Sequence, residues 1–249
     1  MMHDYYKIPG WFNYHEAYDK LATELPDEST IVEIGSFMGR STKYLATNFW
    51  NAEKMKVRIH SVDTFKGSSE HSSLKTGNDF SSVFKDNLQF FLNREMVIQH
   101  KGRSDDKDIL DYFKDESIDA LMIDGAHELE AVKEDIINWY PKVKKGGVIF
   151  GDDFYLKSVE EGMKQGLNHV KEPTYTTYSS QESVWFISKG INSDNTYQKL
   201  VPGINCLVWS HYLLRSKRIK AFKGRFNEFL DTRGWKNWRL QVYSRKDTY

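Results

Sequence analysis

The stretch TIVEIGSFMGRS, residues 30–41, joins a strand to the start of a helix and decides the fold. Its first residues are mostly β-branched and stop at Gly35, a pattern that predicts a short buried strand. Gly35 permits a sharp turn, and Gly39 permits the backbone to approach a ligand at the head of the next helix. In an open parallel sheet, ligands bind at the carboxyl ends of the strands, so we expect a site at this turn.

Strands and helices alternate on both sides of this stretch, which predicts an α/β fold. We expect a Rossmann-like, doubly wound sheet of seven strands that is mostly parallel and ends in an antiparallel hairpin. The expected strands are residues 30–35, 57–63, 96–100, 118–123, 148–150, 174–178 and 184–188. The expected helices are residues 41–50, 80–92, 107–114, 127–143 and 159–167, with the Gly146-Gly147 pair ending the helix 127–143.

The two ends of the chain differ from this pattern. Residues 1–29 predict a helical cap, with a helix at 11–25 that Asn13 caps and Glu16 supports. Residues 30–189 form the expected main domain. Residues 190–249 form an extension with a possible helix at 208–222, and we expect its aromatic side chains, including Trp235 and Trp238, to pack on that domain.

Charge is unevenly distributed, although the chain has no net charge. Residues 191–249 hold 12 Lys and Arg against 4 Asp and Glu, so the rest of the chain is acidic. Such a basic segment suits a solvated surface, a phosphate-bearing partner, an acidic glycan or the acidic body of its own protein.

Other classes of protein are disfavoured by composition. Cys206 is the single cysteine, so an intrachain disulfide is excluded. The first residues lack the basic and apolar regions of a signal peptide, and no stretch is apolar enough to cross a bilayer. We therefore expect a cytoplasmic protein without a membrane partner.

Asp63 ends the second expected strand, beside the glycine turn. A carboxylate there can accept hydrogen bonds from both hydroxyls of a ribose. The dinucleotide fingerprint G-x-G-x-x-G requires glycine where this chain has Phe37 and Arg40, so NAD is disfavoured. The alternative is an ordinary tight turn with no ligand.

Three carboxylates follow two neighbouring strands. Asp124 ends the fourth expected strand, and Asp152-Asp153 end the fifth. Neighbouring parallel strands lie about 4.8 Å apart, so these side chains can meet at the edge of the sheet. An all-oxygen set suits Mg²⁺ first, with Mn²⁺ or Ca²⁺ as alternatives. The competing interpretation is that Asp124 caps the next helix and that Asp152-Asp153 is a solvated turn.

His127 stands three residues after Asp124, at the expected start of the long helix. A helix N-terminus disfavours the imidazolium form, so we expect a neutral ring that is able to accept a proton. The alternative is a histidine that only bonds to the backbone at the start of a helix.

These segments together resemble a known family. Residues 31–42, IVEIGSFMGRST, resemble motif I of class I methyltransferases, in the E-I-G-x-x-x-G-x-S form of small-molecule O-methyltransferases. Residues 118–127, IDALMIDGAH, resemble the D-x-x-x-I-D-G-x-H segment of the family that contains cephalosporin-hydroxylase-like proteins and macrolide sugar O-methyltransferases. Residues 144–149 with Asp152-Asp153 resemble that family's next segment, and the resemblance extends over about residues 30–189.

The resemblance implies a site for S-adenosylmethionine and a divalent cation. By matching position, Gly35 and Ser41 would hold the methionine end, Asp63 the ribose, and Ser104 would lie beside the adenine. The full cofactor-binding set that it implies is Glu33, Gly35, Ser36, Phe37, Gly39, Ser41, Asp63, Thr64, Gly102, Ser104 and Asp124. Asp124, Asp152 and Asp153 match the metal ligands of the metal-dependent members, and His127 matches the proposed base of the macrolide enzymes. Catechol O-methyltransferases have Asn in place of Asp153 and Lys in place of His127.

We therefore expect an O-methyltransferase that acts on a hydroxyl of a small molecule or sugar, with Asp124 and His127 as catalytic residues. The polar segment 67–79 would close over the acceptor. Phenols are the second choice of acceptor, and nucleic acid is disfavoured because no N-P-P-Y-type tetrapeptide follows the fourth strand. The alternatives are a metal-independent methyltransferase and an inactive binding subunit of the same fold. A homo-oligomer remains open, because Trp11, Phe12 and Tyr14 suit either an active-site lid or a subunit contact.

Overall fold

The computed structural model describes residues 4–67, 80–172, 175–178, 184–190 and 240–243. The strands within these ranges are β1 (Thr30–Ile34), β2 (Arg58–Asp63), β3 (Val97–Lys101), β4 (Ile118–Ile123), β5 (Val143–Gly151), β6 (Tyr175–Tyr178), β7 (Trp185–Ser188) and β8 (Leu240–Tyr243). The helices are α1 (His15–Glu24), α2 (Arg40–Asn51), α3 (Phe80–Leu92), α4 (Lys107–Tyr112), α5 (Leu129–Trp139) and α6 (Lys157–His169), with 3₁₀ turns η1 (Tyr5–Lys7) and η3 (Tyr140–Lys142).

All of these strands belong to one sheet with the order β3-β2-β1-β4-β5-β7-β6-β8. The strands β1 to β5 are parallel to one another, and β7 returns antiparallel beside β5 and pairs with β6. The predicted doubly wound, mostly parallel sheet with a final hairpin is therefore confirmed. One strand was missed, because β8 of the C-terminal extension adds an eighth strand beside β6.

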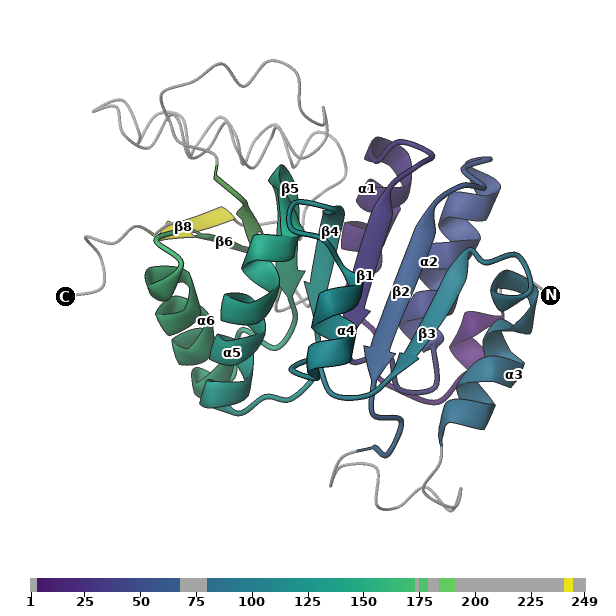
Figure 1. The fold of residues 1–249 in the computed structure, drawn as a ribbon, viewed down its shortest axis with the longest axis horizontal. Coiled ribbons are helices and arrows are strands. Elements are labelled where there is room, and N and C mark those ends of the chain that lie inside the picture. The colour runs from purple at the N-terminus through teal and green to yellow at the C-terminus, as the bar shows by residue number, and fades with distance from the viewer. Residues whose placement is uncertain (1–3, 68–79, 173–174, 179–183, 191–239, 244–249) are drawn as a thin grey trace.

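Helices cover both faces of the sheet (Figure 1). On one face α1, α2 and α3 share a core that includes Tyr18, Phe49 and Phe84. On the other face α4, α5 and α6 pack on the sheet around side chains such as Trp139 and Met163. The strand order reverses between β1 and β4, and a crevice at the carboxyl ends of the strands is expected at this switch point.

The N-terminal helix differs in detail from the prediction. The residue before α1 is Tyr14 rather than Asn13, and its side chain makes no capping hydrogen bond. Tyr14 is instead 1 % exposed and belongs to the core that α1 and α2 share with the sheet. The burial of this aromatic side chain, not a polar cap, holds the start of the helix.

The strand β5 begins earlier than predicted. The helix α5 ends at Trp139, and the Gly146-Gly147 pair lies inside a nine-residue strand instead of ending the helix. The pairing with β4 shifts between Ile118 and Ala120, and Gly146 has a φ of +81°. The glycine pair therefore serves a bulge, where a left-handed backbone is required.

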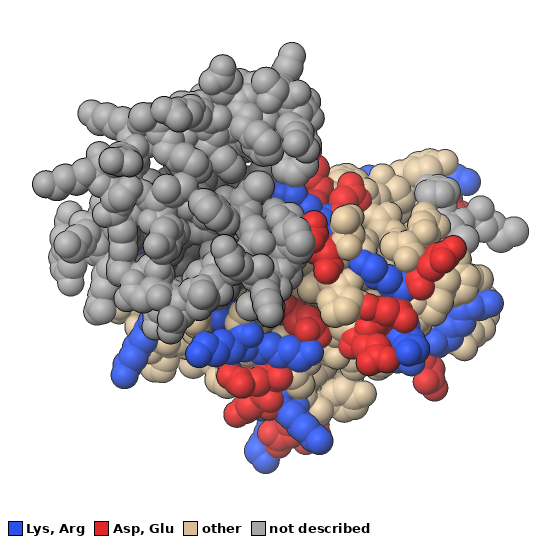
Figure 2. Space-filling model, turned by 90° about the horizontal axis from the view of Figure 1, so that it is seen from above, with Lys and Arg blue, Asp and Glu red and all other residues tan. Residues whose placement is uncertain are grey.

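Ionic side chains of both signs surround the amino ends of the parallel strands. Lys56 pairs with Glu28 before β2 and β1, and Lys144 pairs with Asp119 where β5 and β4 begin. Figure 2, which looks onto this end, shows Lys and Arg interspersed with Asp and Glu on the part formed by described residues. This part of the surface therefore has mixed charge.

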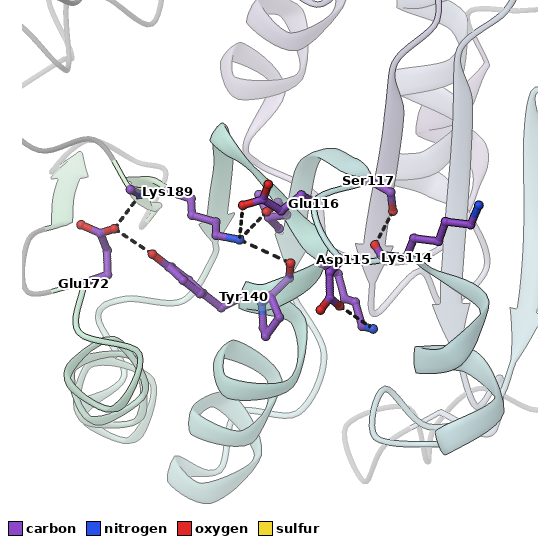
Figure 3. Close-up of polar contacts among 11 residues, drawn as sticks. Lys114, Asp115, Glu116, Ser117, Tyr140, Glu172 and Lys189 are labelled. Carbon is purple, nitrogen blue, oxygen red and sulfur yellow. Dashed lines mark hydrogen bonds and ion pairs between the residues drawn. The ribbon is translucent and has the colours of Figure 1, made fainter. Parts of the chain in front are cut away.

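A polar clamp fastens the end of β7 at the same side of the sheet (Figure 3). The Lys189 ammonium is buried and donates to the carbonyl oxygen of Val143 at 2.6 Å. The carboxylate of Glu172 accepts from the Tyr140 hydroxyl at 3.0 Å and from the Gly190 amide at 2.8 Å. Burial lowers the pKa of Lys189 and raises that of Glu172. These groups lie at the amino ends of β4 and β5, so we assign them a structural role.

Some predictions fall outside the described residues. These are most of the segment 67–79, the helix at 208–222, and the packing of Trp235 and Trp238. Within the described part of the chain, no helix combines the length and the apolar character needed to cross a membrane.

Candidate active site

A cavity of about 1130 Å³ opens at the carboxyl ends of the parallel strands. Its walls come from the turns after β1, β2, β3, β4 and β5, and from residues 9–13 of the N-terminal segment. Sites for drug-sized ligands usually measure about 300–1,000 Å³, so this volume can hold a nucleoside-sized ligand together with a second molecule.

Most of the predicted cofactor residues line this cavity. They are Gly35, Ser36, Phe37, Ser41, Asp63, Thr64, Gly102, Ser104 and Asp124. Gly35 has a φ of +90°, and a Cβ atom there would lie 1.8 Å from the carbonyl oxygen of Asp124. The glycine is therefore required where the turn after β1 meets the turn after β4.

Two of the predicted residues, Glu33 and Gly39, do not line the cavity. Gly39 has a φ of +85°, and a Cβ atom there would lie 2.9 Å from Phe84 and 3.0 Å from Leu88. The missing side chain at Gly39 therefore makes room for the packing of α3.

Glu33 is fully buried beneath the cavity floor. Its carboxylate accepts hydrogen bonds from the hydroxyls of Tyr18 (2.6 Å), Ser36 (3.1 Å) and Thr42. Burial raises the pKa of Glu33, and these hydrogen bonds oppose the rise. The acid therefore ties β1 to α1 and α2.

Asp63 connects the turns after β1 and β2. One of its carboxylate oxygens accepts from the amide of Phe37 at 2.7 Å, and the other accepts from the amide of Phe65 at 2.6 Å. Each carboxylate oxygen has a further lone pair, so Asp63 keeps the capacity to accept from ribose hydroxyls.

A buried acid that the sequence argument missed lies beside Ser104. Asp135 on α5 is 4 % exposed and lines the cavity, and burial raises its pKa to about 6. The indole of Trp139 on the same helix donates to the carbonyl oxygen of Ser104 at 3.0 Å. The available signal was an aspartate on the apolar stripe of α5, since Val132, Ile136 and Trp139 share that face.

Asp124 and Asp153, which follow β4 and β5, lie close together with His127, and Asp152 is not part of this group. One ligand atom from each of Asp124, His127 and Asp153 lies within 4.8 Å of the other two. His127 Nε2 lies 2.9 Å from Asp153 Oδ2. Asp152 also lines the cavity, and its buried Oδ1 atom has no hydrogen-bond partner.

Burial and repulsion between neighbouring carboxylates raise the pKa values of Asp124 and Asp152. Burial first, and then the charge of Asp152, raises the pKa of Asp124 well above its ordinary value. Burial and the charge of Asp153 raise the pKa of Asp152 to about 7. Burial opposes ionisation of Asp153 as well, but hydrogen bonds from His127 and Tyr155 outweigh it and lower the pKa of Asp153.

The position of His127 differs from the prediction. The helix α5 begins at Leu129 with Glu128 as its N-cap, so His127 lies just before the helix and not in its first turn. Its Nε2 atom faces an acceptor, the Asp153 carboxylate, and therefore carries a proton in this contact. In the neutral ring, Nδ1 is then the atom with a lone pair for a further proton.

The N-terminal segment contributes directly to the site. The hydroxyl of Tyr14, at the start of α1, donates to Asp124 Oδ2 at 2.9 Å. Trp11 lines the cavity and is 69 % exposed, whereas Phe12 is buried in the core. The hydrogen bond of Tyr14 to Asp124 joins residues 110 positions apart in the sequence.

Comparison with known proteins shows which family and which relatives the chain resembles. Residues 32–154 match the family model that describes a methyltransferase domain. An uncharacterised protein of Acanthamoeba polyphaga mimivirus is 32% identical over 131 residues, which is 51% of this chain and 52% of that protein. An uncharacterised protein of Sinorhizobium fredii is 28% identical over 135 residues, 54% of this chain and 14% of that protein. The chain thus spans about half of one curated relative and a small part of the other.

Solved structures share the fold. An O-methyltransferase from Bacillus cereus in complex with SAH superposes with a TM-score of 0.52 at 14% identity, covering 74% of this chain and 86% of that one. The O-methyltransferase TomG from Streptomyces achromogenes, in complex with SAM, gives 0.50 at 15% identity, covering 76% and 86%. A protein provisionally described as an rRNA methylase from Clostridium thermocellum gives 0.52 at 13% identity, covering 73% and 98%. The family match and this shared fold together identify residues 32–154 as a class I methyltransferase domain.

Proposed function

We propose that the protein transfers a methyl group from S-adenosylmethionine to a hydroxyl of a small molecule or sugar, with the help of a divalent cation. The observation that carries this proposal is the convergence of Asp124, His127 and Asp153 in the cavity that Gly35 and Asp63 also line. The methyl donor and the methyl acceptor would therefore bind in the same cavity. The SAH and SAM complexes of the Bacillus cereus and Streptomyces achromogenes O-methyltransferases support the choice of methyl donor.

The residues that line the cavity suit each part of S-adenosylmethionine in turn. Ser104 and Asp135 would face the adenine, and Asp63 the ribose. Gly35 and Ser41 would face the methionyl group, and this order places the transferable methyl toward Asp124.

The acidic cluster also fits a cation. Burial and neighbouring carboxylates raise the pKa values of Asp124 and Asp152, and the Oδ1 atom of Asp152 is buried without a partner. A nearby positive charge would relieve both defects. We propose Asp124, Asp152 and Asp153 as the ligands, with Mg²⁺ as the first choice and Mn²⁺ or Ca²⁺ as alternatives. An ion bound there would hold the acceptor hydroxyl and lower its pKa.

His127 is the proposed base. Its contact with Asp153 fixes the ring, and a neutral imidazole can accept the proton that the acceptor hydroxyl loses. General-base catalysis of this kind typically contributes about 10²–10⁴-fold to a rate. The closeness of His127 to Asp124 and Asp153 also makes the ring a possible ligand, and a metal titration of His127→Gln distinguishes the two roles.

The proposed acceptor is a polyol or sugar, because vicinal oxygens can chelate a cation, and phenols are the second choice. The fold is shared with the protein described as an rRNA methylase, so the fold alone does not select the acceptor. We propose a cytoplasmic location.

The decisive experiment combines binding and turnover. Calorimetry of the full chain with S-adenosylmethionine tests the donor site, and absence of binding would favour the inactive binding subunit. Transfer of a labelled methyl group is then measured on sugars, catechols and RNA, with Mg²⁺ or with excess EDTA. We expect sugar methylation that EDTA abolishes; full activity in EDTA would favour the metal-independent alternative.

A matched pair of variants separates the cation site from a general effect of charge. Asp152→Asn should abolish turnover while the affinity for S-adenosylmethionine stays unchanged. Asp111→Asn removes an exposed carboxylate of α4 that pairs with Lys107 away from the cavity, and it should leave both unchanged.

A further inference from the structure

Acidic groups dominate the cavity. Among the described residues that line it, eight carboxylates stand against two guanidinium groups, those of Arg40 and Arg103. S-adenosylmethionine carries a sulfonium and an ammonium group, which suit these surroundings. Its α-carboxylate does not, because a carboxylate among carboxylates is repelled unless a cation meets it.

Arg103 is already paired. Its guanidinium binds Asp105 through two hydrogen bonds, Nε to Oδ1 at 2.7 Å and Nη2 to Oδ2 at 3.0 Å. A bidentate pair of this kind uses the face of the guanidinium that recognises carboxylates. Arg103 is therefore not the cation that a ligand carboxylate would find.

Arg40, in contrast to Arg103, has no carboxylate partner among the described residues. Its Nη1 atom donates to the carbonyl oxygen of Gly10 at 2.5 Å, and no carboxylate of the described residues forms an ion pair with it. Its Nε atom is buried without an acceptor. A guanidinium has five N–H donors, and a buried donor without a partner costs free energy. The hydrogen bond to Gly10 uses one of these donors, but it does not neutralise the positive charge of the guanidinium.

The position of Arg40 matches the methionyl end of the proposed donor. Arg40 is the first residue of α2 and directly precedes Ser41, which lines the same cavity. The ribose partner Asp63 bonds to Phe37 in the turn that leads to Arg40. A donor with its ribose at Asp63 would therefore extend its amino-acid part along this turn.

We propose that Arg40 binds the α-carboxylate of S-adenosylmethionine and so selects a donor that carries a free amino-acid group. This inference rests on the proposed function, since it assumes that the cavity holds this cofactor. The guanidinium is suited to the task because its planar fork matches a carboxylate. The same side chain ties residue 10 to α2, so cofactor binding would also hold the N-terminal wall of the cavity in place.

The test compares two ligands that differ in the carboxylate. S-adenosylhomocysteine has the complete amino-acid group, whereas 5′-methylthioadenosine keeps the adenosine and the sulfur but lacks it. Calorimetry measures both ligands on the wild-type full chain and on Arg40→Gln. We expect Arg40→Gln to weaken S-adenosylhomocysteine by roughly 10–100-fold, the usual worth of a hydrogen bond to a charged group, and to leave methylthioadenosine within about twofold.

Lys43→Gln is the matched control. Lys43 lies on the same helix and also fastens the N-terminal segment, through an ion pair with Asp4 at 2.7 Å, but it does not line the cavity. This variant should change neither affinity. Binding of methylthioadenosine by Arg40→Gln reports that the cavity is still folded.

Every other outcome would overturn either this inference or the proposed function. Equal losses for both ligands would show that Arg40 only supports the cavity wall, and an unchanged affinity for S-adenosylhomocysteine would show that Arg40 meets no carboxylate of the cofactor. Either result overturns the inference and leaves the proposed function intact. A wild-type protein that binds neither ligand would overturn the proposed function itself, and the inference with it.

Discussion

Replacement of Tyr14 by Phe removes one hydroxyl from the wall of the cavity and leaves the ring in place. That hydroxyl donates to Asp124 Oδ2 at 2.9 Å, and the side chain is 1 % exposed. The ring packs against Phe12 and Tyr18 with centroid distances of 4.8 and 5.1 Å, and these contacts survive the substitution. The change therefore removes the hydrogen bond to Asp124 and the polar contact of the hydroxyl with Tyr18, and keeps the packing of the ring.

The size of the effect follows from the charge and burial of the partner. A hydrogen bond to a charged group is worth about 1.5–3 kcal/mol, and loss of a partner that orients a metal ligand typically costs about 10–100-fold in metal affinity. Asp124 is already opposed by Asp152 and Asp153, so a lost donor is not easily replaced. We expect Tyr14→Phe to weaken Mn²⁺ binding by about 10–100-fold and to lower turnover at limiting metal.

The assay is Mn²⁺ calorimetry in the presence of S-adenosylhomocysteine, accompanied by urea denaturation. Tyr44→Phe is the control, because its hydroxyl also bonds to an aspartate, Asp19 at 2.6 Å, outside the cavity. Metal affinity equal to that of the wild type in Tyr14→Phe would refute the reasoning, and it would do so even if the variant were less stable. Such a result would mean that Tyr14 supports the fold without positioning Asp124.

Three further predictions concern the fold and the ion. Gly35→Ala should lose about 2–5 kcal/mol of unfolding free energy, from left-handed strain and from the clash with the Asp124 carbonyl; a wild-type urea midpoint would contradict this. Burial and the charge of His100 lower the pKa of His60 to about 3, so below pH 6.5 the unfolded chain binds a proton that the native protein does not. Stability should therefore fall by about 2 kcal/mol from pH 7 to pH 5, and His60→Asn should reduce this slope; equal slopes would exclude the assignment. Mg²⁺ at a hundred times its dissociation constant should raise the unfolding free energy by about 2.7 kcal/mol, an effect that EDTA reverses, whereas an unchanged melting temperature would count against the ion.

The sheet was predictable because its parallel strands are buried runs of apolar residues. Four of the five residues of β1 are buried, as the run at residues 30–34 indicates. The start of β5 was missed because Lys144, Lys145 and two glycines have no strand periodicity, and the pairing there depends on a bulge. The strand β8 is also short, and it pairs with β6, a strand more than 60 residues earlier in the chain, which local sequence cannot reveal.

The sequence could predict those site residues that directly follow a strand of the parallel sheet. Asp124 and Asp153 meet because β4 and β5 are neighbours, and the spacing of parallel strands brings their carboxyl ends together. The contributions of Tyr14 and Arg40 were not predictable, because they depend on how the N-terminal segment packs against the turns. The packing of α3 against Gly39 was not predictable either, because the sequence of a turn does not show which neighbouring helix approaches its glycine.

The hydroxyl of Tyr14 lies outside residues 32–154, the part of the chain that defines the family. A protein trimmed to those limits would keep β2 to β5 and most of β1, but would lose the N-terminal wall of its pocket and the hydroxyl that donates to Asp124. A comparison limited to residues 32–154 therefore leaves out a contact to Asp124 and one wall of the cavity, both of which the N-terminal segment supplies.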